Sequence, residues 1–188
     1  MEWKKQILEQ IGLASTTLTA RDWILLMLLA DDRRPMVGEE SLHIAFFMMQ
    51  VPPFSFKPLL FSVYSSELHR ALEELMEEGL VRRSVSFERG RAVESIALTD
   101  KGALEAYSLA EKVRKTWVLV GELVIREGSK ILGELEALKK TYNGKDLNEW
   151  IKLFLDRIDN PESLFDLWFS KDEIEYMKKI YSQFKRVL

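Results

Sequence analysis

Four arginines gather in one short stretch of this chain: Arg82, Arg83, Arg89 and Arg91. Together with one glutamate, Glu88, they give residues 81–92 a net charge of +3, whereas the whole chain of 188 residues carries −3. A guanidinium group presents paired N–H donors, so exposed arginines at this density suit contact with phosphate. The alternative is a solvated segment whose arginines form ordinary surface ion pairs.

The residues around these arginines predict a β-hairpin. Strands are expected from about Val81 to Phe87 and from Ala92 to Leu98. Gly90 lies in the turn between them and is free to adopt a positive φ angle. The hairpin would therefore carry its positive charge at and near its tip.

A helix is predicted directly before the hairpin, in SELHRALEELMEEG. Ser65 or Ser66 is placed to cap its start, and Gly79 is placed for the left-handed turn at its end. Its apolar side chains form one stripe, made of Leu68, Leu72, Leu75 and Met76. Five glutamates and one arginine between Ser65 and Glu78 give this helix a net charge of −4.

Other kinds of chemistry find little support in the composition. The chain has no cysteine, which excludes disulfides, thiolate metal sites and cysteine catalysis. Its two histidines, His43 and His69, are too few for an obvious metal site, so no metal and no cofactor are expected. His43 is expected to be packed inside the protein and His69 to be partly exposed. No glycine-rich phosphate loop and no nucleophile beside a base occur, so we expect no enzyme and no catalytic residue.

Pairs of adjacent carboxylates do not change this expectation. Glu39-Glu40, Glu73-Glu74 and Glu77-Glu78 point about 100° apart on a helix, so the members of a pair do not converge on one substrate. The aromatic stretch FFMMQVPPFSF is expected to pack in the core, although lining a ligand pocket is the alternative. We expect these groups to be structural or solvated.

The amino-terminal part predicts three further helical segments. They are expected at residues 3–13, at Ala20–Ala30, where Thr19 and Asp22 resemble a capping box, and from Gly38 to about Gln50. The apolar run WILLMLLA is far too short to span a bilayer and reads as a buried helix. No signal peptide is recognisable, so we expect a cytoplasmic protein without membrane association.

The carboxy-terminal part predicts one long helix, from Asp100 to about Tyr142, capped by Thr99, with an interruption near its glycines as the alternative. Three further helices are expected, one from Asp146 to about Asp159, a short one after the NPES turn, and one that begins at Ser170 with Glu173 in a capping box. Apolar residues of the long helix follow a mixed three-and-four spacing that suits pairing of two chains, with glycines allowing close approach. The predicted homodimer interface comprises Val113, Trp117, Val120, Gly121, Val124, Gly128, Ile131 and Leu135.

The segments YSSELHRALEELMEEGLV and IALTDKG resemble the third helix and the second wing strand of winged-helix proteins. The likeness is to MarR-like and PadR-like regulators and archaeal winged-helix proteins, over about residues 19–110. The resemblance implies a mainly α fold with a small β-hairpin wing. It implies a winged helix-turn-helix domain in residues 1–110 and a helical dimerisation or interaction region in residues 111–188.

The resemblance also implies a function, binding of double-stranded DNA by a dimeric transcriptional regulator or chromatin-associated factor. The third helix would enter the major groove and the wing would lie along phosphates. The implied DNA-binding residues are Lys57, Ser65, Ser66, His69, Arg70, Arg82, Arg83, Arg89 and Arg91. Because the third helix is acidic and repels phosphate, an adaptor that binds another protein remains the alternative.

Overall fold

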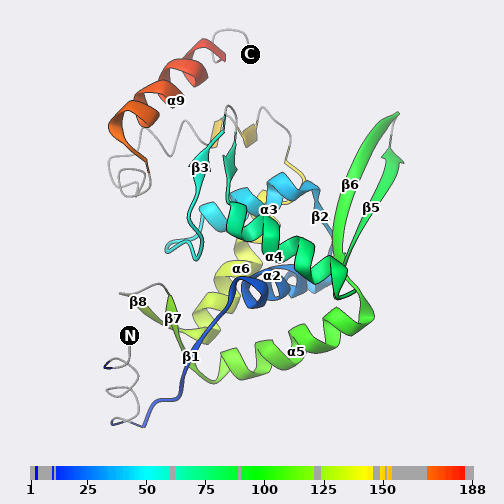
Figure 1. Ribbon diagram of the computed structural model, residues 1–188, viewed down its shortest axis with the longest axis vertical. Coiled ribbons are helices and arrows are strands. Elements are labelled where there is room, and N and C mark those ends of the chain that lie inside the picture. Colours follow the sequence, from blue (N-terminus) through cyan, green and yellow to red (C-terminus); the bar gives the residue numbers. More distant parts are fainter. Residues whose placement is uncertain are drawn as a thin grey trace.

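A computed structural model describes residues 3, 10, 12–59, 62–88, 90–120, 124–145, 149–150, 152–153 and 169–184. The helix α2 (Ala20–Leu29) lies at the centre of the fold (Figure 1). Three other helices pack against it, namely α4 (Ser66–Glu77), α5 (Asp100–Arg114) and α6 (Gly128–Tyr142). The helix α3 (Gly38–Phe47) packs against α6 and completes the core.

The central helix forms because its start is capped and its surface from Trp23 onward is apolar. The Thr19 side chain accepts a hydrogen bond from the backbone N–H of Asp22, and the Asp22 carboxylate accepts one from the backbone N–H of Thr19, which confirms the predicted capping box. All side chains from Trp23 to Leu28 are buried, as a helix covered on several sides requires. The aromatic stretch that begins in the last turn of α3 is also core, since Phe46, Phe54 and Phe56 are buried.

The predicted hairpin is present and belongs to a three-stranded antiparallel sheet. Its strands are β5 (Val81–Glu88) and β6 (Arg91–Leu98), and β2 (Met36–Val37) pairs with the other edge of β6. Gly90 adopts a φ of 78° in the turn, as predicted. In Figure 1 the outer half of the hairpin projects away from the helices.

Two more small sheets complete the described strands. In one, β1 (Ser15–Thr17) runs parallel to β7 (Trp117–Val120), which pairs in an antiparallel manner with β8 (Val124–Glu127). In the other, β3 (Lys57–Pro58) pairs with β4 (Val63–Tyr64). A 3-10 turn, η1 (Asp31–Arg33), follows α2, and the helix α9 (Lys171–Phe184) lies near the carboxyl end. None of the described helices has the length and apolarity needed to cross a membrane.

The predicted fold class is wrong. A mainly α winged helix-turn-helix domain with a helical carboxy-terminal region would carry one hairpin, but the described residues form three small sheets and a mixture of α and β structure. The long helix expected from Asp100 to Tyr142 is interrupted by β7 and β8. Two features explain the interruption, namely the β-branched side chains of WVLV and of the VI pair of β8, which favour strands, and the parallel pairing of β7 with β1.

Most residues of the predicted dimer interface are buried within the single chain. Val113, Ile131 and Leu135 are fully buried within the single chain and Val120 is nearly so, while Trp117 and Val124 are half-buried in strands. Val113, Val120, Ile131 and Leu135 therefore contribute to the core of one chain. Gly121 lies outside the described residues, as do most of residues 3–13 and 146–159, where helices are predicted.

Gly128 has a close contact of its own. A Cβ atom at Gly128 would lie 1.9 Å from the carbonyl oxygen of Val113, so only glycine allows α6 to begin at this place. The close approach that the sequence suggested therefore occurs inside one chain, between α5 and the start of α6.

A buried lysine joins α6 to the end of α2. The Nζ atom of Lys139 is fully buried and donates to the carbonyl oxygens of Leu28, at 2.8 Å, and Ala30, at 2.9 Å. Burial lowers the pKa of Lys139 from 10.5 to about 8, and the nearby carboxylates of Asp31 and Glu136 only partly oppose this shift. A neutral amine keeps two N–H groups, enough for both carbonyls.

We predict that Lys139 makes the free energy of unfolding rise with pH between about 8 and 10.5. In this window the unfolded chain binds the lysine proton and the folded chain has lost it, so unfolding becomes less favourable. The rise from this one group should reach about 2–3 kcal/mol. Urea unfolding at pH 7.5 and at pH 10, for the wild type and for Lys139→Met, measures this rise as the difference between the two proteins. The same pH dependence of the free energy of unfolding in both proteins would contradict the prediction.

Candidate nucleic-acid interface

The strand register divides the hairpin into two faces. Residues directly opposite each other on paired strands point to the same side of the sheet. Arg82 lies opposite Ala97, Ser84 opposite Ser95 and Ser86 opposite Val93, so these six share one face. Arg91 lies on that face too, opposite Glu88. We call it the arginine face of the hairpin.

The arginine face is exposed and polar. Arg82, Ser84, Ser86 and Arg91 are all solvent-exposed, and neither arginine forms an ion pair with another described residue. Arg91 lies opposite Glu88, which is six residues after Arg82 on β5. At about 3.4 Å per residue, the positions of the two arginines are therefore about 20 Å apart along the hairpin. The face is therefore long enough to contact two separate phosphates, with serine hydroxyls between them. Arg89 lies outside the described residues.

The opposite face of the hairpin is used differently. Arg83 lies there with the exposed side chains of Val85 and Phe87, of which Phe87 is 81% exposed. The guanidinium of Arg83 contacts Glu39 of α3 at 2.8 Å, Glu73 of α4 at 3.1 Å and Glu94 of β6 at 3.6 Å. Arg83 is predicted to hold a phosphate, but the structure places it among three carboxylates at the base of the hairpin.

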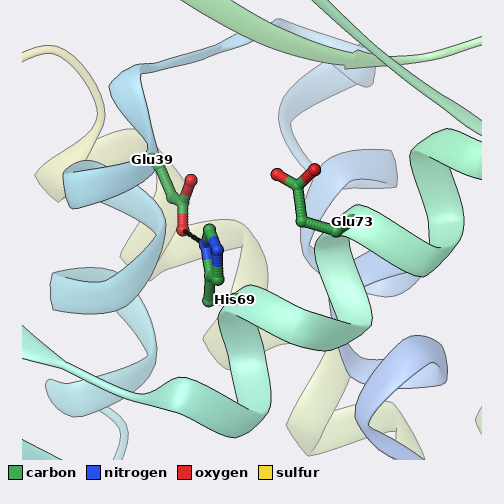
Figure 2. Close-up of side chains that lie close together, drawn as sticks. All are labelled: Glu39, His69 and Glu73. Atoms are coloured by element: carbon green, nitrogen blue, oxygen red, sulfur yellow. Dashed lines mark hydrogen bonds and ion pairs between the residues drawn. The ribbon is translucent and has the colours of Figure 1, made fainter.

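Glu39 is the centre of a network that sequence analysis missed. Its Oε1 atom accepts hydrogen bonds from His43 at 3.2 Å and His69 at 2.6 Å, and its Oε2 atom accepts from Arg83 (Figure 2 shows the bond to His69). Burial alone would raise the Glu39 pKa, but the hydrogen bonds from His43 and His69 hold it at about 2. Glu39 is therefore ionised at all ordinary pH values.

His43 occupies the buried end of this network, as the sequence predicts for its position. Its exposed fraction is 3%, and its Nδ1 atom accepts a hydrogen bond from the backbone N–H of Ser65 at 3.1 Å. The Nε2 atom must then carry the proton that is donated to Glu39. His43 thereby links the start of α4 to α3.

The start of α4 presents fewer groups to a ligand than expected. Ser65 is 1% exposed, and its hydroxyl caps α4 by accepting from the backbone N–H of Leu68. It is confirmed as the cap and is not available for a groove contact. Ser66 is exposed at the first position of the helix.

The remaining predicted contacts are scattered. The side chain of His69 is 42% exposed but is hydrogen-bonded to Glu39. The Nε atom of Arg70 lies 3.9 Å from Oε1 of Glu74 in an exposed ion pair. Lys57 is exposed on β3, which lies beyond the opposite end of α4 from the hairpin in Figure 1. The structure therefore gathers Arg82 and Arg91 on one surface and places Lys57 elsewhere.

A signal for the missed network is present in the sequence. Glu39 and His43 are four residues apart on one helix, and His69 and Glu73 are four apart on another, so each pair shares a helix face. Nothing in the sequence shows that these two faces meet. That juxtaposition follows only from the packing of α3 beside α4.

Comparison with known proteins assigns no family. No protein-family model and no curated protein matches the chain. The crystal structure of smu.1604c from Streptococcus mutans UA159 is similar over 90% of this chain and 94% of that one, with 19% sequence identity and a TM-score of 0.37. A similarity this low supports no conclusion about function, which must come from the geometry of this chain.

We predict that adjacent serines at the start of α4 respond differently to substitution. Ser65→Ala should lower the free energy of unfolding by about 1 kcal/mol, because the variant has no buried cap. Ser66→Ala, the matched control, should change it by less than about 0.5 kcal/mol, because Ser66 is exposed. Urea unfolding at pH 7 measures both. Equal effects of the two substitutions would contradict the assignment of Ser65 as the cap.

Proposed function

We propose that this protein binds double-stranded DNA, with the arginine face of the hairpin as its main contact. The observation that carries the proposal is the exposed pair Arg82 and Arg91, which share one face of a projecting hairpin. Both guanidinium groups are free of ion pairs with the described residues, so a phosphate displaces only water and counterions. The serines between them offer hydroxyl donors of the kind that accompany phosphate contacts in protein–DNA interfaces.

The charge around α4 limits what such binding can read. Glu67, Glu74 and Glu77 are exposed on α4, and carboxylates repel the phosphates that flank a groove. Deep insertion of α4 into the major groove is therefore disfavoured. The proposal is binding through the backbone of the duplex, with modest sequence preference and strong dependence on salt.

The second candidate is binding to a protein partner. The same exposed glutamates favour it, because an acidic helix surface complements a basic surface on another protein. The exposed Val85 and Phe87 side chains on the other face of the hairpin add apolar area for such a contact. Failure to bind duplex DNA at low salt, with the fold intact, would favour this candidate.

We predict that the double variant Arg82→Ala/Arg91→Ala binds duplexes of every sequence more weakly. The slope of log affinity against log salt should fall by about 0.9 for each phosphate that the variant no longer neutralises. Fluorescence anisotropy with a random-sequence duplex over a salt series measures both effects.

The matched control removes the same charge elsewhere. Lys112 and Lys115 are exposed at the end of α5, far from the hairpin tip in Figure 1. Lys112→Ala/Lys115→Ala should retain nearly the wild-type slope. Equal slopes for the wild type and the hairpin variant, or an equal weakening in the two double variants, would contradict the assignment of the arginine face.

A further inference from the structure

Three side chains beside the hairpin base are arranged in a way that suits a metal ion. Glu39 of α3 and His69 and Glu73 of α4 each offer one ligand atom, and these atoms all lie within 4.8 Å of one another (Figure 2). Zinc bonds of about 2.0–2.2 Å place tetrahedral ligand atoms roughly 3.3–3.6 Å apart. Small side-chain rotations therefore bring the three atoms onto one ion.

We propose that Glu39, His69 and Glu73 bind a divalent transition-metal ion of the Zn²⁺ class. One imidazole and two carboxylates form a ligand set that zinc accepts, and softer thiolate ligands are not needed. His69 and Glu73 are four residues apart on α4 and so project from one helix face, while Glu39 reaches them from the neighbouring helix. Three protein ligands leave a fourth position for water.

The charge of the cluster supports a cation at this place. Three carboxylates, those of Glu39, Glu73 and Glu94, surround the single guanidinium of Arg83. The Oε1 atom of Glu94 is buried and accepts no hydrogen bond from a described residue. The cluster thus holds more negative charge than its one arginine neutralises, and a divalent ion would balance it.

Arg83 and the ion compete for the same carboxylates. Arg83 contacts one oxygen of Glu39 and one oxygen of Glu73, so its positive charge weakens the attraction of these carboxylates for a metal ion. Removing Arg83 should therefore strengthen metal binding. This competition separates a metal site from a purely structural ion-pair network, in which Arg83 would have no effect on a metal.

A pocket beside the cluster gives the fourth position access to solvent. Its volume is about 310 Å³, and its lining includes Glu39, His69, His43 and Tyr64. Two of the three proposed ligands therefore border a space large enough for several waters or a small ligand. The site is independent of DNA binding, since neither Arg82 nor Arg91 takes part in it.

Titration of the chelator-treated full chain with ZnCl₂ by calorimetry tests the site, with MgCl₂ as the comparison ion. We expect one zinc per chain and much weaker magnesium binding. His69→Gln and Glu73→Gln should each weaken zinc binding at least about tenfold. Loss of a residue that only hydrogen-bonds to a metal ligand already has an effect of about this size, and these two variants each remove a ligand itself. Arg83→Gln should tighten it.

Glu77→Gln is the matched control, because Glu77 is exposed one turn further along α4 and lies outside the cluster. It should leave zinc affinity unchanged, and circular dichroism should show that all variants remain folded. Absence of zinc binding by the wild type, equal effects of Glu73→Gln and Glu77→Gln, or weaker binding by Arg83→Gln would overturn the proposal.

Discussion

The carboxylate of Glu39 is the interaction on which the arrangement of this surface depends. It accepts hydrogen bonds from His43 on its own helix, His69 on α4 and Arg83 on β5. One ionised group therefore fixes the relative positions of two helices and the base of the hairpin. A partly buried carboxylate without hydrogen-bond partners destabilises the folded protein, so loss of the partners of Glu39 would be strongly destabilising. Arg83 ties the base of the hairpin to this carboxylate, and the pairing of β6 with β2 also holds the hairpin to the body of the protein.

The same network divides the arginines of the hairpin into two groups. Arg83 is held among carboxylates and stabilises the junction, whereas Arg82 and Arg91 remain in solvent on the opposite face. Alternation along the strand produces this division, since neighbouring residues point to opposite sides of a sheet. A count of arginines alone overstates the positive charge available to a partner. The usable charge lies along one face, and the acidic surface of α4 lies nearby.

Much of the local structure could be predicted from the sequence because its signals act over a few residues. Thr19, Ser65 and Thr99 cap the helices that follow them, and Gly90 lies in the turn of the hairpin, as short-range interactions predict.

The fold class could not be predicted from such short-range signals. The strands β7 and β8 have helix-like apolar spacing, and the parallel pairing that joins Ser15–Thr17 to Trp117–Leu119 of β7 connects segments far apart in the sequence. The candidate site was predicted only in part, for the same reason. The exposed arginines follow from the hairpin pattern, but Glu39 comes from a helix that precedes α4 by many residues. Pairs spaced by four residues reveal which side chains share a helix face and not which faces meet.

The proposed binding of duplex DNA, through contacts with the DNA backbone, is tested most directly by comparing two duplexes of equal length and unrelated sequence. The affinity of the wild-type protein for each duplex is measured at low salt and at physiological salt. We expect similar affinities for the two duplexes at each salt concentration and a steep common fall as salt increases. Absence of binding to both duplexes at low salt would contradict it, as would tight binding to one duplex that salt leaves unchanged.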